Sequence, residues 1–257
     1  MTGPILVFDS GIGGLSVLTE IRKQLPNNHY HYLFDNARMP YGNLSEHELV
    51  TGCVELIMQQ ADVIKPSVIV VACNTASTLV LPKLRQRLSV PIVGVVPAIK
   101  PAAAKSINKH IGLLATPGTV ARDYTQVLIN NFANDCTVEL FGSSELVLMA
   151  EEYIASGEID LGKLEKVLRP ITLTDIDVLV LGCTHFPIIA QHISSIIGKN
   201  VQLLDSGEAI ANRVSSLITK EEYLNSKLDV SFTKKIAEGL NKALVDYGFT
   251  TMKLITD

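Results

Sequence analysis

Short hydrophobic runs alternate along the chain with stretches in which apolar residues recur every three or four positions. Val68–Val71 and Val178–Leu181 are unbroken aliphatic runs, a pattern typical of strands buried on both faces of a parallel sheet. The predicted strands are residues 4–8, 30–34, 67–72, 91–95, 110–115, 137–141, 176–182 and 201–204. Because helical stretches repeatedly separate these strands, the pattern predicts an α/β fold with mostly parallel sheets.

Helix-start signals fit the same pattern. Ser45 followed by Glu48 is a capping-box sequence, and it precedes an apolar-periodic stretch over residues 49–64. Pro187 suits the first turn of a helix that we expect to run to Ile197. A short edge strand is predicted near the end of the chain, at residues 252–256.

The alternation is interrupted after the fourth predicted strand, where Pro97 and Pro101 stand. A second crossing, near residues 204–209, would return the chain to its first half. We therefore expect two α/β domains that face one another. The predicted domains are residues 1–96 plus 208–257, and residues 97–207.

Two internal echoes predict that these domains are pseudosymmetric. An apolar strand, a small residue and a cysteine occur in that order before Cys73 and again before Cys183. Likewise, the Asp-Ser-Gly sequence that starts at Asp9 recurs at Asp205. Each echo is short, but two echoes in one chain are hard to attribute to chance.

The composition narrows the class of protein. With 257 residues, 47% of them hydrophobic, the chain can bury a core, and its net charge of −4 argues against a nucleic-acid partner. No apolar run approaches the roughly 18 residues of a membrane span, and no basic segment precedes the first strand as in a secretory signal. Four cysteines without a CxxC spacing argue against a disulfide scaffold and a structural zinc site. We expect a cytoplasmic globular protein without a bound metal.

Two of the four cysteines occupy positions suited to chemistry. Cys73 and Cys183 each follow a predicted strand and precede a predicted helix start, where backbone N–H groups favour anions and lower the pKa of a thiol. Cys53 and Cys136 are expected to be packing residues. Two equivalent thiols can exchange the roles of general base and general acid on opposite faces of a substrate. A hydrolase with one nucleophilic cysteine and a redox pair are the alternatives.

Several loops at strand ends offer polar groups. The loop that begins at Asp9 partly matches a dinucleotide-binding fingerprint, for which Asp35 would be the ribose ligand, but the third glycine is replaced by Ser16. Residues 116–119 follow a strand and can donate to a carboxylate or simply cap a helix. His185 stands two residues after Cys183 and can set the proton affinity of that thiol.

Taken in order, these motifs resemble those of the glutamate racemases, a family within the cofactor-independent aspartate/glutamate racemase superfamily. The resemblance covers the chain almost end to end and is weakest after about residue 220. It rests on the segments 9–14, 40–42, 72–77, 116–119, 182–187 and 205–207. Aspartate or hydantoin racemase, a nucleotide-binding module and a non-catalytic amino-acid-binding protein are the alternative functions.

The resemblance implies an active site at the interface of the two domains. It also implies that Cys73 deprotonates D-glutamate and that Cys183 deprotonates L-glutamate, without a cofactor. It implies assisting roles for Asp9, His185 and Glu151, although no motif distinguishes Glu151 from the adjacent Glu152. The implied substrate contacts are Asp9, Ser10, Tyr41, Gly42, Asn74, Thr75, Thr116, Thr119 and Thr184. The implied role is the supply of D-glutamate for peptidoglycan, and family members are commonly homodimers.

Overall fold

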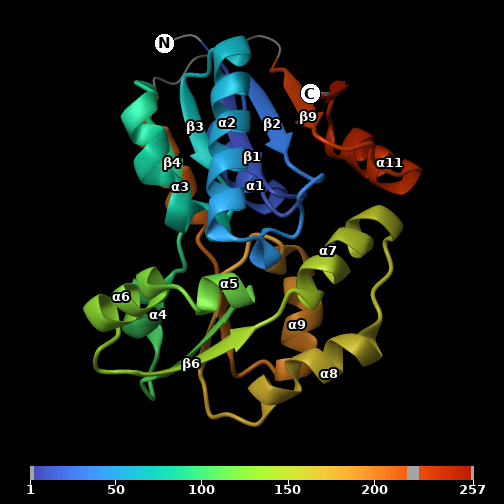
Figure 1. Ribbon diagram of the computed structural model, residues 1–257. Coiled ribbons are helices and arrows are strands. Elements are labelled where there is room, and N and C mark those ends of the chain that lie inside the picture. Colours follow the sequence, from blue (N-terminus) through green and yellow to red (C-terminus); the bar gives the residue numbers. More distant parts are fainter. Residues whose placement is uncertain (1–2, 219–225, 256–257) are drawn as a thin grey trace.

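The computed structural model of the protein describes residues 3–218 and 226–255, whose strands form two separate sheets (Figure 1). The first sheet has the strand order β10-β9-β2-β1-β3-β4 and the second has the order β6-β5-β7-β8. The strands are β1 (Ile5–Asp9), β2 (Tyr30–Phe34), β3 (Val68–Val71), β4 (Ile92–Gly94), β5 (His110–Ala115), β6 (Thr137–Gly142), β7 (Val178–Leu181), β8 (Gln202–Leu204), β9 (Leu228–Phe232) and β10 (Thr251–Leu254). All pairings among the described residues are parallel, which confirms the predicted fold class.

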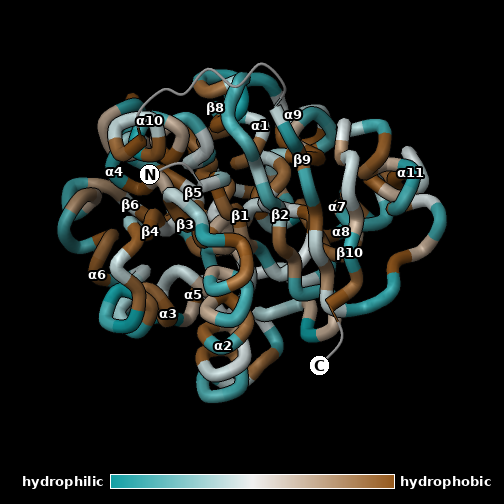
Figure 2. Tube along the Cα trace, turned by 90° about the horizontal axis from the view of Figure 1, so that it is seen from above, coloured by the Kyte–Doolittle hydropathy of each residue, from teal (hydrophilic) through white to brown (hydrophobic). Residues whose placement is uncertain are grey.

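Helices cover both faces of the six-stranded sheet. Along β1, Ile5 and Val7 pack toward α1 (Leu15–Gln24) and α10 (Gly207–Leu217), whereas Leu6 and Phe8 pack toward α2 (Glu46–Ile64) and α3 (Asn74–Arg87). Because both faces are covered, Ile5–Phe8 of β1 form an unbroken hydrophobic run. Figure 2 shows hydrophilic and hydrophobic positions alternating along the surrounding helices, as expected for helices with one buried side.

The remaining helices complete the two layers around the sheets. The other α-helices are α4 (Ile99–Lys105), α5 (Pro117–Val120), α6 (Asp123–Phe132), α7 (Glu145–Ser156), α8 (Leu161–Thr172), α9 (Ala190–Ile197) and α11 (Glu238–Tyr247). There are also two 3₁₀ helices: η1 (Tyr41–Asn43) lies between β2 and α2 along the chain, and η2 (Phe186–Ile189) lies between β7 and α9. No helix of the described residues is both long and apolar enough to cross a membrane.

The predicted helix starts fare differently. The capping box is confirmed: the Ser45 hydroxyl accepts from the backbone N–H of Glu48, whose carboxylate accepts from the backbone N–H of Ser45. The helix predicted from Pro187 to Ile197 is confirmed at its end, but its first turn is the 3₁₀ helix η2 and α9 begins only at Ala190. Pro187 has no N–H, and Phe186 and Ile188 instead donate to carbonyl groups three residues back. The predicted edge strand is present as β10, and residue 256 lies outside the described residues.

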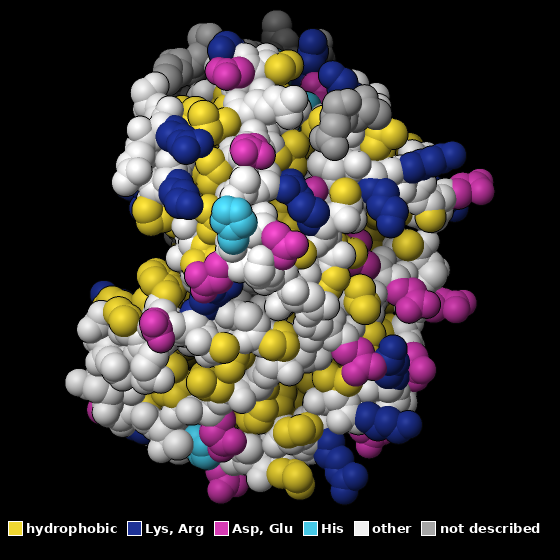
Figure 3. Space-filling model, in the orientation of Figure 1, with side chains coloured by type: hydrophobic (Ala, Val, Ile, Leu, Met, Phe, Trp, Pro, Cys, Tyr) yellow, Lys and Arg dark blue, Asp and Glu magenta, His cyan; other side chains and the backbone are white. Residues whose placement is uncertain are grey.

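The chain passes twice between the two sheets, and the two crossings lie side by side. The Ser206 hydroxyl donates to the carbonyl oxygen of Val96 at 2.6 Å. The two sheets separate into an upper and a lower lobe in Figure 1, and the surface is hollowed between them at one side in Figure 3. Strand membership supports the predicted division at residues 96/97 and 207/208, which we retain as a proposal.

Candidate active site

Cys73 and Cys183 line one cavity although they belong to different sheets. Cys73 follows β3 in the six-stranded sheet and immediately precedes α3, and Cys183 follows β7 in the four-stranded sheet. Both are free thiols, with 5% and 7% of their surface exposed. The other residues around the cavity are Ser10, Pro40, Tyr41, Gly42, Asn74, Thr75, Thr116, Val147, Thr184 and His185.

The cavity is almost closed. Its free volume is about 10 Å³, which is room for roughly one water molecule. Gly42, from η1 of the upper lobe, lies against the Thr116 side chain of the lower lobe. Beside this contact, Arg122 of the lower lobe forms an ion pair with Glu46 at the start of α2. The two lobes therefore meet at this side of the cavity and would have to separate to admit an amino acid.

Asp9 lies behind the cavity wall, next to Cys73. Its carboxylate accepts from the backbone N–H groups of Ser10 at 2.7 Å and Gly14 at 2.5 Å, and from the Thr184 hydroxyl at 3.2 Å. Complete burial raises the pKa of Asp9 from its ordinary value of 3.8 to about 6, although His185 and the two N–H groups oppose this shift. Asp9 therefore combines a fixed position with a proton affinity suited to exchange near neutral pH.

Cys183 has a positively charged neighbour. The Nδ1 atom of His185 lies 3.8 Å from its sulfur, and the Nε2 atom of His185 is hydrogen-bonded to the Glu151 carboxylate at 2.8 Å. Burial alone would lower the pKa of His185, but the interactions with Cys183 and Glu151 outweigh burial and raise it well above 6.5. This direction favours the imidazolium form of His185, and an imidazolium stabilises a nearby thiolate.

Cys73 has the opposite environment. Burial raises the pKa of the Cys73 thiol well above its ordinary value, and the negative charge of Asp9 raises it further. The backbone N–H of Ala76, in the first turn of α3, acts in the other direction but does not outweigh burial. The prediction that the helix start lowers the pKa of this thiol is therefore wrong, because it neglected burial and the neighbouring carboxylate.

Glu151 rather than Glu152 contacts His185 in the cavity wall. Besides His185, the Glu151 carboxylate accepts from the backbone N–H of Ile12 at 2.8 Å, so it joins the two lobes. Glu152 is exposed. Val147, which was not predicted, lines the cavity one helical turn before Glu151. The sequence has no signal that singles out this pair, because Leu148 and Glu152 have the same four-residue spacing.

Hydroxyl and amide groups cluster at the other end of the cavity. Thr75 and Thr116 are hydrogen-bonded at 3.0 Å across the two lobes, and Thr119 bonds to both from behind the cavity wall. Thr116 also caps α5, so it combines the two roles that the sequence left open. The Asn74 side-chain NH₂ is buried without a hydrogen-bond partner among the described residues. A donor in this state is suited to a ligand that carries an oxygen acceptor.

The loop after β1 does not match a dinucleotide site. A Cβ atom on Gly11 would overlap the Glu151 carboxylate, and one on Gly13 would overlap the His185 ring. These glycines therefore permit close contact between the lobes, and the N–H groups of Ile12 and Gly14 are bonded to carboxylates. The expected ribose ligand, Asp35, is buried and engaged by protein donors.

The other two cysteines lie outside the cavity. Cys53 is fully buried in α2, as predicted. Cys136 is partly exposed, and its sulfur lies 3.6 Å from the Asp135 carboxylate. Cys136 also packs against the hydrophobic core of the second sheet, in agreement with its expected role as a packing residue. No group of three or more potential metal ligands occurs among the described residues.

Comparisons with known proteins give the family. The model of the Asp/Glu/hydantoin racemases matches residues 5–214. The chain belongs to this family. The chain is 66% identical to a glutamate racemase of Shewanella frigidimarina, over 100% of this chain and 99% of the relative. It is therefore an amino-acid racemase, an isomerase, of the glutamate racemase type.

Solved structures agree with this assignment. The Escherichia coli glutamate racemase, solved with L-glutamate and the activator UDP-MurNAc-Ala, superposes with a TM-score of 0.93 at 42% identity, covering 99% of this chain and 98% of that one. A Francisella tularensis glutamate racemase, solved with D-glutamate, gives a TM-score of 0.80 at 26% identity, with coverage of 99% and 98%. The two-lobed α/β architecture is thus that of the family.

Proposed function

We propose that this racemase interconverts L- and D-glutamate without a cofactor and that Cys73 and Cys183 are its two bases. The observation that carries the proposal is the placement of two free thiols from different lobes around one small cavity, each with its own ionisable neighbour. Glutamate as substrate is supported by relatives named glutamate racemase and by two structural neighbours that bind L- or D-glutamate.

The two thiols have different ionisable neighbours. His185 stabilises negative charge beside Cys183, whereas burial and Asp9 keep Cys73 protonated. In the L-to-D direction, the Cys183 thiolate takes the α-proton of L-glutamate, and the Cys73 thiol gives its proton to the opposite face of the α-carbon. One proton is removed and one is supplied, so the configuration at the α-carbon inverts while the composition of the substrate stays the same.

The reverse direction exchanges these roles. After one L-to-D turnover, Cys73 is a thiolate and Cys183 is a thiol, the form that accepts D-glutamate. Restoration of the first form requires proton exchange through solvent or the neighbouring groups. Asp9, with its pKa of about 6, is suited to return a proton to Cys73.

Binding groups are available for the rest of the substrate. The unpaired Asn74 NH₂ and the hydroxyls of Thr75, Thr116 and Thr184 can donate to the two carboxylates of glutamate. Donors fixed in a cavity that excludes water stabilise the negative charge that develops when the α-proton leaves. Because the closed cavity holds roughly one water molecule, separation and closure of the lobes belong to the catalytic cycle.

The biological role that follows is the supply of D-glutamate for peptidoglycan synthesis in the cytoplasm. This role and a homodimeric assembly derive from the family resemblance. Aspartate is the competing substrate, and it differs from glutamate by one methylene group in the side chain. Turnover of aspartate at a rate equal to that of glutamate would contradict the assignment to glutamate.

The reaction is tested by incubation of the purified protein with L-glutamate in deuterium oxide, with no cofactor added. Chiral chromatography should detect D-glutamate, and mass spectrometry should detect deuterium at the α-carbon. If neither appears, the proposed function is wrong.

The mechanism is tested by separate replacement of the two thiols. Cys73→Ala and Cys183→Ala should each abolish racemisation in both directions, because each direction needs both a base and an acid. Cys136→Ala is the matched control, since Cys136 lies outside the cavity, and it should retain activity. Full racemisation by either active-site variant would contradict the two-thiol mechanism.

A further inference from the structure

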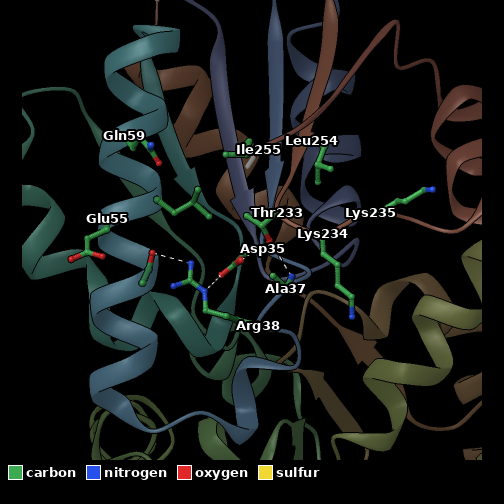
Figure 4. A pocket seen from close by; sticks show the side chains of 12 residues that line it. Asp35, Ala37, Arg38, Glu55, Gln59, Thr233, Lys234, Lys235, Leu254 and Ile255 are labelled. Atoms are coloured by element: carbon green, nitrogen blue, oxygen red, sulfur yellow. Dashed lines mark hydrogen bonds and ion pairs between the residues drawn. The ribbon is translucent and has the colours of Figure 1, made fainter. Parts of the chain in front are cut away.

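A second, larger cavity of about 520 Å³ lies away from the two catalytic thiols (Figure 4). It is formed by α2 and by the segments that follow β2, β9 and β10. At its base is Asp35, which is fully buried although it carries a carboxyl group. The proposed mechanism does not use Asp35, so its burial requires another explanation.

Three donors converge on the Asp35 carboxylate, two from the segment after β2 and one from the segment after β9. Arg38 Nε donates at 2.6 Å and the Tyr41 hydroxyl at 2.5 Å, both to Oδ2. The Thr233 hydroxyl donates at 2.7 Å to Oδ1 while accepting from the backbone N–H of Ala37. Figure 4 shows Arg38 and Thr233 approaching Asp35 from opposite sides. A carboxylate can accept all three bonds, whereas an amide cannot.

Arg38 is itself held against α2. Its guanidinium donates to the carbonyl oxygen of Gly52 at 3.0 Å, and a Cβ atom on residue 52 would overlap the guanidinium. Glycine is unfavourable inside a helix, so its presence at position 52 is explained by the space that Arg38 needs. Through Asp35 and Gly52, Arg38 therefore links the end of β2 to α2.

Asp35 is also connected, through Tyr41, to the wall of the cavity that holds the two thiols. The Tyr41 phenol points to Asp35, while the residue itself and Gly42 line the cavity that holds both thiols. Burial raises the pKa of Tyr41 well above 10, so its hydroxyl stays protonated and donates. On its cavity side, Gly42 touches Thr116 of the opposite lobe. A shift of Tyr41 would therefore move one wall of the substrate site.

We propose that Asp35 is a positioning residue for glutamate racemisation: through Tyr41 it fixes the η1 wall against which the substrate binds. This inference rests on the proposed function, because it assigns Asp35 a part in that same reaction. Arg38 and Thr233 hold Asp35 in place, and Asp35 holds the Tyr41 hydroxyl. Asp35 does not line the cavity that holds the two thiols, so it acts on that cavity through Tyr41.

The test compares Asp35→Asn with Glu55→Gln. Both replace a carboxylate by an amide in the lining of the second cavity, but Glu55 is exposed and has no hydrogen bond to Asp35. We expect kcat/KM of Asp35→Asn to fall about tenfold, because a misplacement of 1 Å can cost up to about a hundredfold. KM for glutamate should rise in Asp35→Asn, whereas Glu55→Gln should match the wild type.

The change in KM separates positioning from a folding defect. A partly unfolded variant has fewer active molecules, which lowers the apparent kcat and leaves KM unchanged. The rise in melting temperature caused by glutamate gives a second readout that needs no turnover, and it should be smaller in Asp35→Asn. A loss confined to kcat, with normal stabilisation by glutamate, would overturn the proposal.

A double-mutant cycle identifies the route. Tyr41→Phe removes only the hydroxyl that bonds to Asp35 and should impair kcat/KM in the same way. If Asp35 acts through Tyr41, adding Asp35→Asn to Tyr41→Phe causes little further loss, whereas fully additive losses would refute this route. If the wild type makes no D-glutamate, the proposed function fails; if it does and Asp35→Asn equals Glu55→Gln, only the positioning role fails.

Discussion

The buried Asp9 carboxylate should make the protein less stable as the pH rises. Burial raises its folded-state pKa from 3.8 to about 6, so the folded protein binds this proton more tightly than the unfolded chain does. The resulting stabilisation is fully present below the unfolded pKa and is lost as the pH rises through the folded pKa. Each tenfold change in proton affinity corresponds to about 1.4 kcal/mol, so ionised Asp9 costs about 3 kcal/mol of stability at neutral pH.

Asp9→Asn removes this titration while nearly preserving the shape of the side chain. The amide loses acceptor capacity toward Ser10 or Gly14, but that loss does not depend on pH. Relative to the wild type, the free energy of unfolding of Asp9→Asn should therefore increase by about 1.4 kcal/mol between about pH 5 and about pH 8. Urea unfolding at both pH values measures this difference, provided that the m-values of the two proteins agree.

Asp62→Asn is the matched control, because the Asp62 side chain is 79% exposed. Its free energy of unfolding should follow that of the wild type across the same pH range. Racemisation should slow in Asp9→Asn, since Asp9 is the proposed proton partner of Cys73. Stability of Asp9→Asn that changes with pH in parallel with the wild type would refute the conclusion that burial dominates the pKa of Asp9.

Two further predictions concern the Glu151–His185 contact and the Arg122–Glu46 ion pair. Glu151→Gln should move the high-pH loss of L-glutamate racemisation to lower pH by about 1–2 pH units, because Glu151 helps to raise the pKa of His185. Glu152→Gln is the control and should leave the pH–rate profile unchanged. Equal pH–rate profiles for both variants would contradict this role of Glu151. Arg122→Gln should raise KM by up to about fivefold with little change in kcat, as expected for the loss of a partly exposed ion pair. Steady-state kinetics of Glu46→Gln should show the same change, since either substitution breaks the pair.

Sequence pattern predicted those parts of the fold that depend on local periodicity. Val68–Val71 and Val178–Leu181 are buried throughout, so their unbroken apolar runs identified central strands. The capping box at Ser45 was equally predictable from the sequence, because both of its partners lie within four residues. The helix expected from Pro187 to Ile197 differs only in its first turn, because Pro187 suits the first turn of a 3₁₀ helix as well as that of an α-helix.

Contacts between distant segments could not be predicted in this way. Asp35 resembled a ribose ligand because it follows β2, and only the fold brings Thr233 and Tyr41 to its carboxylate. Similarly, the adjacent Glu151 and Glu152 are equivalent in composition, but the position of α7 places only Glu151 beside His185. Such residues are identified by what they contact, and a single sequence contains that information only through the fold.

The two cysteines show how far an internal echo can be trusted. The matching strands before Cys73 and Cys183 predict equivalent positions, but the neighbouring charges are opposite: a carboxylate, Asp9, beside one thiol and an imidazolium, His185, beside the other. A two-base reaction needs one thiol and one thiolate at the same time, and unlike neighbours favour that state because they give the two sulfurs different proton affinities. The pseudosymmetric fold therefore accounts for the facing positions of the sulfurs, whereas the difference between their neighbours accounts for the unequal protonation that the proposed two-base reaction requires.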